Sequence, residues 1–213
     1  MKPKFIYYGI IVPLSILAPI IFGSINFKKA NHSHKLLFYY LIVSGIINLS
    51  AIILMRFRVQ NLPLLHLYTI VETVFILSYF RTIFYSKAIK KALLFTIVLF
   101  PIICVVNFST LQSIYSFNTY TRPLEAILIT LFCLLYLYQS GFTENWISKP
   151  INWFNMGILI YFPVACVIFI LSNYLTTSTN KAMNTMVWNL HATLVLIMYL
   201  IWAKGFSLIK KDG

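Results

Sequence analysis

Apolar residues in this chain come in runs of about 20, the length that crosses about 30 Å of hydrocarbon as an α-helix. Short polar stretches separate these runs. Hydrophobic residues make up 60% of the 213 residues and charged residues 10%, where a soluble domain carries about 25% charged residues. So few charges cannot cover the surface of a soluble protein of this size. The sequence therefore predicts an all-α fold, a polytopic transmembrane helix bundle.

We expect about seven spans in a single transmembrane domain that covers residues 1–213. The predicted spans are 5–27, 36–55, 63–80, 92–109, 123–141, 153–175 and 187–207. The loops between them are too short to fold alone, and the chain shows no internal repeat or low-complexity tract. The first run follows Lys2 and Lys4, as a signal peptide would, but it lacks a small-residue cleavage site and ends at Lys28 and Lys29. We interpret it as a retained helix.

Lys and Arg total 17 against four acidic residues, which gives a formal charge of +13. Counted by alternate loops, six of these basic residues, Arg122 among them, share the side of the N-terminus, and eleven share the side of the C-terminus. Cytoplasmic loops carry the excess of Lys and Arg, so we predict an N-terminus outside the cell membrane and a cytoplasmic C-terminus. The basic residues are expected to contact the lipid bilayer. No basic stripe interleaved with aromatic residues indicates a nucleic-acid partner.

Several familiar chemistries lack their motifs in this chain. Cys104, Cys133 and Cys166 all lie in apolar segments, which indicates packing rather than disulfides or a zinc site. There is no HExxH or HxxxH pair, no Walker loop and no GxSxG elbow. Lys204 lies near the cytoplasmic end of the last span, where a snorkelling lysine is ordinary, so we do not expect a retinal Schiff base.

Glu72 is the most informative residue of the sequence, because an ionisable group in hydrocarbon is costly unless it is paired, neutral or facing a cavity. It lies about nine residues into the third span, near the bilayer midplane. His66 and Thr69 precede it on the same helix, and the helical period places all three in one wide polar wedge. Glu72 is either a protonated acid that is hydrogen-bonded to another helix, or a group that binds a ligand, a proton or an ion.

Other polar residues fall at a similar depth or nearer the outer face, and we expect an outward-facing pocket with Glu72 at its base. Glu125 after Pro123 also has an ordinary explanation, because an acid in the first turn of a helix is favoured by the helix dipole. A single histidine in an apolar span is often structural. The candidate ligand-binding residues are His66, Thr69, Glu72, Arg122, Glu125, Asn189, His191 and Asn48.

The run from Asn61 to Glu72, NLPLLHLYTIVE, resembles a motif of small multi-pass membrane proteins from Bacteroidetes-type bacteria. In that family Asn, His, Tyr and an acid follow one another on one helix, and a further His opens the last helix, as His191 does here. Pro63 departs from the motif, where an aromatic residue is expected. The resemblance implies a bacterial inner-membrane protein, and it carries no known activity or cofactor.

Three classes of function fit these residues. The first is a binding or sensory module, in which the pocket holds a small or lipidic ligand and a helix movement passes to a membrane or cytoplasmic signalling partner. The second is an intramembrane metal-assisted lipid hydrolase, with His66, Glu72 and His191 as the candidate metal ligands. The third is a proton- or ion-coupled carrier in which Glu72 titrates. We rank them in that order, and the sequence leaves open whether the protein is an enzyme.

Overall fold

The computed structural model describes residues 7–141, 145–177 and 181–209, and every regular element in these ranges is helical. Six helical segments are long and apolar enough to cross a membrane, which confirms the predicted all-α helix bundle. The long helices are α4 (His32–Arg56), α5 (Leu62–Ile83), α6 (Lys87–Val106), α7 (Thr121–Ser140), α8 (Pro150–Thr177) and α9 (Lys181–Ser207). A π-helical turn, Asn107–Leu111, continues α6.

The first predicted span, 5–27, differs from the other six. Its described part is broken into a π-helical turn at Tyr7–Ile11, α2 (Val12–Ser15) and α3 (Leu17–Ile25), so its apolar α-helix is shorter than a full span. Pro19 supplies the reason, because a proline has no N–H to donate to the carbonyl four residues earlier, where α2 ends.

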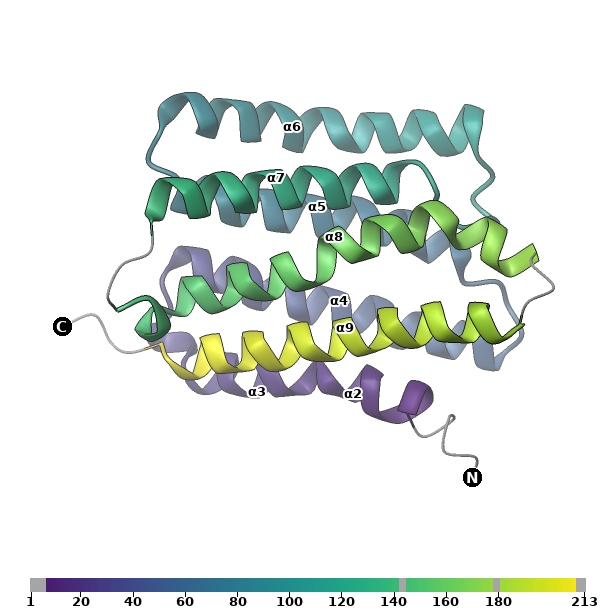
Figure 1. The fold of residues 1–213 in the computed structure, drawn as a ribbon, viewed down its shortest axis with the longest axis horizontal. Helices are drawn as coiled ribbons and strands as arrows, with labels where there is room; N and C mark the ends of the chain where they lie inside the picture. Colours follow the sequence, from purple (N-terminus) through teal and green to yellow (C-terminus); the bar gives the residue numbers. More distant parts are fainter. Residues whose placement is uncertain (1–6, 142–144, 178–180, 210–213) are drawn as a thin grey trace.

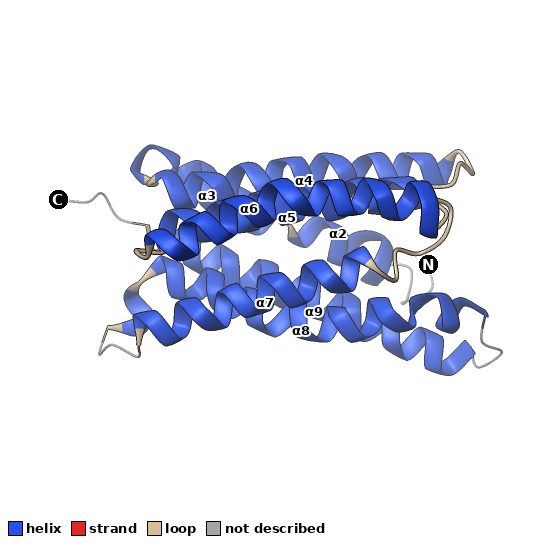
Figure 2. Cartoon of the chain, turned by 90° about the horizontal axis from the view of Figure 1, so that it is seen from above, coloured by secondary structure: helices blue, strands red, loops and turns tan. Residues whose placement is uncertain are grey.

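The helices form two layers of three (Figures 1 and 2). One layer holds α4, α5 and α6, and the other holds α7, α8 and α9, with α8 packed against both α7 and α9. α5 joins the layers through its contacts with α7. The α2–α3 segment packs along α9 and also contacts α4, so it covers the open edge between the two layers.

Local sequence signals explain where the helices begin. The side chain of Asn31 accepts a hydrogen bond from the backbone N–H of His34 at 3.0 Å and caps α4. Ser86 caps α6 in the same way, and Pro63 occupies the first turn of α5, where its missing N–H costs nothing.

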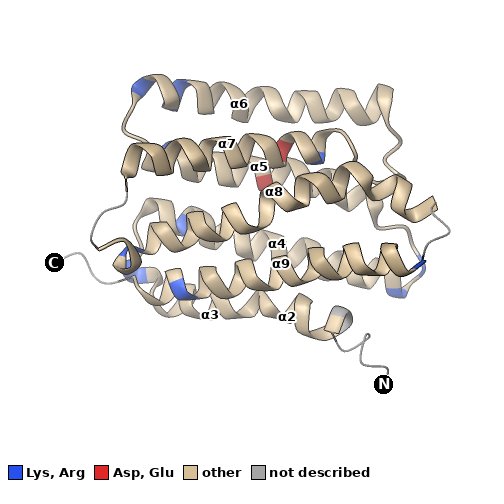
Figure 3. Ribbon diagram, in the orientation of Figure 1, with Lys and Arg blue, Asp and Glu red and all other residues tan. Residues whose placement is uncertain are grey.

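Among the residues that the structure describes, the charged ones gather at the ends of the bundle, except for three. Figure 3 shows most Lys and Arg residues at the end where α4, α6 and α8 begin and α9 ends. These residues are Lys28, Lys29, Lys35, Arg81, Lys87, Lys90, Lys91, Lys149 and Lys204. In contrast, Glu72 and Glu125 lie inside the bundle, and so does Arg122, which the charge count by loops had treated as a loop residue.

Candidate functional site

A non-helical segment, residues 112–120, brings the start of α7 into the interior of the protein. Its residues are tied to three neighbours: the backbone carbonyl of Ser116 lies 3.2 Å from Nε2 of His66, Asn118 Nδ2 donates to the Thr69 hydroxyl at 3.2 Å, and the backbone of Phe117 bonds the Asn173 side chain. Irregular backbone is tolerated at membrane depth only where protein or a cavity surrounds it. The segment therefore places the first turn of α7 beside the middle of α5.

Asn118 fixes the first turn of α7. Its Oδ1 accepts from the backbone N–H groups of Thr121 at 3.0 Å and Arg122 at 3.2 Å, as a capping side chain does. Arg122 and Glu125 follow on this turn, and both are buried. The capped helix start thus places a guanidinium and a carboxyl group next to Glu72.

Arg122 makes ion pairs with two carboxylates at once, and we call Glu72, Arg122 and Glu125 the triad. Its Nη1 pairs with Oε2 of Glu72 across the α5–α7 contact and donates to Oε2 of Glu125 at 2.6 Å. Glu72 is 1% exposed and Glu125 is 0% exposed. Three buried ionisable groups in direct contact are costly in a bilayer and are typical of functional positions in membrane proteins.

The other oxygen of Glu72 is held by two phenols. Tyr68, one turn earlier on α5, donates to Oε1 at 2.9 Å, and Tyr40 on α4 donates to the same oxygen. The two tyrosine hydroxyls lie 2.7 Å apart, and Ser44 lies 3.1 Å from the Tyr68 hydroxyl. Both oxygens of Glu72 therefore have polar partners from three different helices.

The polar contacts continue from Arg122 to the last helix. Arg122 Nη2 donates to the Tyr161 hydroxyl on α8 at 3.5 Å, and that hydroxyl lies 3.1 Å from Nε2 of His191 on α9. The guanidinium also lies between two rings, 5.1 Å from the centre of Tyr68 and 5.0 Å from that of Phe169. Glu72 and His191, on different layers, thus belong to one connected network.

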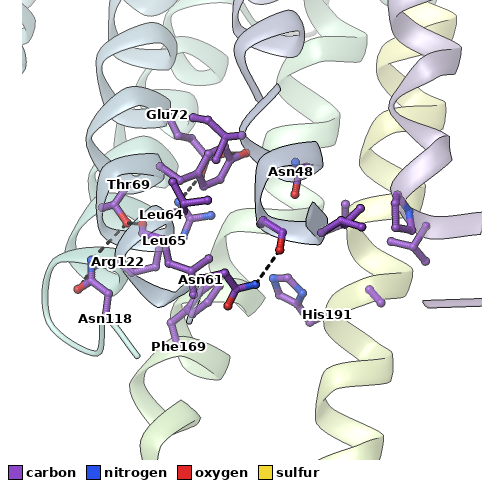
Figure 4. A pocket seen from close by; sticks show the side chains of 18 of the residues that line it. Asn48, Asn61, Leu64, Leu65, Thr69, Glu72, Asn118, Arg122, Phe169 and His191 are labelled. Carbon is purple, nitrogen blue, oxygen red and sulfur yellow. Dashed lines mark hydrogen bonds and ion pairs between the residues drawn. The ribbon is translucent and has the colours of Figure 1, made fainter. Parts of the chain in front are cut away.

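A cavity of about 490 Å³ leads away from this network toward the end of the bundle where α4 ends and α5 begins. Figure 4 shows Glu72, Arg122 and His191 around it, with Asn48 and Asn61 farther along. Most of its wall is apolar and comes from α2, α4, α5, α8 and α9. Glu125 lies behind Arg122 and does not line the cavity.

Six of the eight candidate residues line the cavity or contact a residue that does, and the other two lie elsewhere. Thr69, Glu72, Arg122 and His191 line the cavity, and Glu125 joins through the ion pair. Asn48 also lines it but donates to the Ser44 carbonyl of its own helix at 2.9 Å. His66 is buried against Phe108 and the 112–120 segment, and neither His66 nor Asn189 lines the cavity.

Metal binding finds no support in the arrangement of these side chains. Within residues 7–141, 145–177 and 181–209, no three His, Cys, Asp or Glu side chains gather closely enough to hold a metal ion. The candidate ligands His66, Glu72 and His191 are all among these residues. His66 is directed toward Ser116 and away from the triad, which separates the proposed ligands.

Tyr40 and Tyr161, which complete the network, were not among the predicted site residues, and Tyr68 was named only as part of the family motif that the run from Asn61 to Glu72 resembles. Tyr40 and Ser44, like Tyr68 and Glu72, are four residues apart on one helix, so each pair shares a face. This spacing would have marked Tyr40 and Tyr68 as partners of a buried acid. Tyr161 carries no such signal, because its neighbours on α8 are apolar.

Comparisons with protein-family models, with curated proteins and with solved structures found no match to this chain.

Proposed function

We propose that this protein binds a small amphipathic or lipidic molecule in the cavity and acts as a binding or sensory module. The observation that carries the proposal is the cavity of about 490 Å³, whose apolar wall ends at Glu72, Arg122 and His191. Ligand sites are mostly apolar pockets of about 300–1,000 Å³ with a few convergent polar groups. An alkyl chain fits the wall, and a polar head group fits the inner end.

The helices that surround the cavity suggest how binding reaches a partner. The wall includes α2, which packs along α9 and ends at a break at the cavity-lining Ile16, where α3 follows. A segment broken into short helices moves more readily than a continuous span, because fewer backbone hydrogen bonds hold it. A ligand between α2 and α4 would shift this segment, and a membrane or cytoplasmic partner would sense the shift.

We further propose seven crossings of a bacterial inner membrane, with the N-terminus outside. The α2–α3 segment runs along the bundle from the end opposite to that where α9 ends, as an odd number of crossings requires (Figure 1). Arg122 is buried, so it does not belong in the count of Lys and Arg in the outer loops. Without it, the excess of Lys and Arg on the side of the C-terminus is larger, which favours the same orientation. A reporter that works only outside the cytoplasm should be active at the N-terminus and inactive at Gly213, and the opposite result would reverse the orientation.

The experiment that tests ligand binding fills the cavity. Ala51 lines it, so Ala51→Phe should displace the ligand, whereas Ala92→Phe places the same ring on the exposed side of α6. Native mass spectrometry of the protein extracted in a mild detergent should detect a bound small molecule in the wild type and in Ala92→Phe, and not in Ala51→Phe. Equal retention in both variants would contradict the proposal.

A proton- or ion-coupled carrier is the second candidate, and one observation favours it. Residues 112–120 form irregular backbone next to buried ionisable groups, a feature of discontinuous helices in transporters. Uptake into vesicles that depends on a pH gradient, and that is lost in Glu72→Gln, would raise this candidate above the sensory one.

A further inference from the structure

The negative and positive charges of the triad do not cancel. Two carboxylates and one guanidinium sum to a net charge of −1 when all three are ionised. No other Lys or Arg of the described chain lines the cavity, and the remaining described basic residues lie at the ends of the bundle. An isolated charge in a low-dielectric interior is expensive, and a buried acid commonly takes up a proton to remove it. Geometry alone therefore points to one proton in the triad.

The contacts show where the proton would sit. Two phenols donate to Oε1 of Glu72, and Arg122 forms an ion pair with its Oε2. Glu125 shares the same guanidinium nitrogen through Oε2, and within the described residues no phenol donates to it, although Thr73 also interacts with this carboxyl. Glu125 is therefore the less stabilised carboxylate of the two, and the proton would sit on it. The groups that face the two acids are Tyr40 on α4, Tyr68 on α5, Cys104 on α6, Arg122 on α7, Tyr161 on α8 and Tyr199 on α9. His191 on α9 faces Arg122 and Tyr161 instead.

We propose that the triad binds one proton at neutral pH and that the cavity takes a cationic amphiphile, which displaces this proton. The second half rests on the function proposed above. A cationic head group beside Glu72 would restore neutrality once the proton has left through the cavity. An anionic head group would instead compete with two carboxylates that already occupy Arg122. Tyr68, Tyr161 and Phe169 line the inner end of the cavity with aromatic rings, and such faces attract organic cations.

Infrared spectroscopy of the ligand-free protein tests the proton directly, because the chain has only four acidic side chains. The carbonyl stretch of a protonated carboxylic acid, in an ester-free detergent at neutral pH, should report one such group in the wild type. Glu72→Gln and Glu125→Gln each leave one acid for Arg122, so both should lose the band. Arg122→Gln leaves two acids without a counter-charge, and the band should double.

The absence of this band in the wild type, or an unchanged band in both Gln variants, would disprove the proposal that the triad binds one proton. This result stands apart from ligand binding, which the Ala51→Phe comparison tests. If Ala51→Phe retains the ligand as Ala92→Phe does, while the carbonyl band behaves as expected, the proposed function is wrong but the triad still binds one proton.

Addition of an amphiphile tests the exchange. Dodecylammonium should abolish the band, whereas dodecanol, with the same chain and no charge, should leave it. Butylammonium at the same concentration should have a much weaker effect, because it cannot fill the apolar wall. If dodecylammonium leaves the band, the exchange is disproved. An equal effect of butylammonium would show that the cavity selects a small soluble cation, which also contradicts the proposal.

Discussion

Aromatic rings and glycines close the half of the bundle where α8 begins, whereas polar side chains and a cavity occupy the half where α8 ends. In the closed half, the Phe154 and Phe206 ring centres lie 4.8 Å apart, and Trp202 donates to the Phe154 carbonyl at 3.0 Å. Gly157 and Gly205 let these rings approach the neighbouring backbone: a Cβ on Gly157 would lie 2.5 Å from Trp202 Nε1. In the open half, carboxylates and phenols from several helices converge instead.

The difference separates two ways of joining helices in a membrane. Lipid tails are as apolar as the helix surfaces, so the hydrophobic effect does not drive helices together within a membrane. Helices can associate instead by close packing at small residues, which needs no polar group. The closed half therefore holds the helices in place mainly by shape, together with a few buried hydrogen bonds such as that from the Tyr79 hydroxyl to Asn155 Oδ1 at 3.1 Å. The triad adds little that packing could not supply, since a buried ion pair stabilises a protein no better than an apolar replacement of similar volume. Its presence in the open half is therefore consistent with the binding function proposed above.

Arg122→Gln should cause a larger loss of stability than any other single substitution in the triad or in the closed half. Removal of one partner from a buried ion pair typically costs about 3–5 kcal/mol, because the two remaining acids lose their counter-charge and must take up protons in the interior. The thermal unfolding midpoint in detergent should fall clearly below that of the wild type.

A triple variant with Glu72→Gln, Arg122→Gln and Glu125→Gln provides the control. It has no charge left to compensate, so most of the lost stability should return. A triple variant as unstable as Arg122→Gln alone would mean that the guanidinium acts through packing and not through charge.

Gly157→Ala probes the closed half and should have the next largest effect. The added methyl group would meet the indole of Trp202, and overpacking of this kind typically costs about 1–3 kcal/mol. Gly45→Ala is the matched control, because its Cβ would find no atom nearer than 3.9 Å. Unfolding midpoints should fall for the first variant and stay level or rise for the second. Equal midpoints would contradict the interlocked packing.

The sequence predicted the long helices well but placed the starts of two of them, α6 and α9, too far inward. Apolar runs suggested starts at 92 and 187, whereas α6 begins at Lys87 and α9 at Lys181. The additional turns are polar, and they form because the helices continue beyond the hydrocarbon, as the Ser86 cap of α6 illustrates. A hydrophobicity pattern measures burial in lipid and says nothing about these turns.

The candidate site was predictable in part. Glu72 was identified from the cost of a charge in lipid, yet its pairing with Arg122 depends on which helices are neighbours. Arg122 was counted as a loop residue for the orientation and was also named as a candidate for the pocket, but a short polar stretch does not reveal that its guanidinium pairs with Glu72. Pro123 indicated a helix start, whereas the capping role of Asn118, four residues before Arg122, was not predicted.

Glu72→Gln should leave stability close to that of the wild type but abolish ligand retention, because Gln keeps the size of the side chain and removes its charge. The measurement pairs the unfolding midpoint with native mass spectrometry. A stable variant that still holds the ligand would exclude a functional charge at this position.

Glu125→Gln sharpens this comparison, since Glu125 lies outside the cavity wall. If the charge of the triad as a whole matters, Glu125→Gln should lose the ligand as Glu72→Gln does. If direct contact with Glu72 matters, only Glu72→Gln should lose it.

The smallest effects separate the two candidate histidines, His66 and His191. His66 faces the Ser116 carbonyl at 3.2 Å outside the cavity, whereas His191 lines the cavity and faces Tyr161. His66→Leu removes one hydrogen bond from the 112–120 segment and should reduce the free energy of unfolding by about 1 kcal/mol, with ligand retention preserved. His191→Leu should change the unfolding midpoint less and weaken ligand retention more. Unfolding in detergent and native mass spectrometry of the same samples give both values. A loss of ligand in His66→Leu alone would move the binding site from the cavity toward the 112–120 segment.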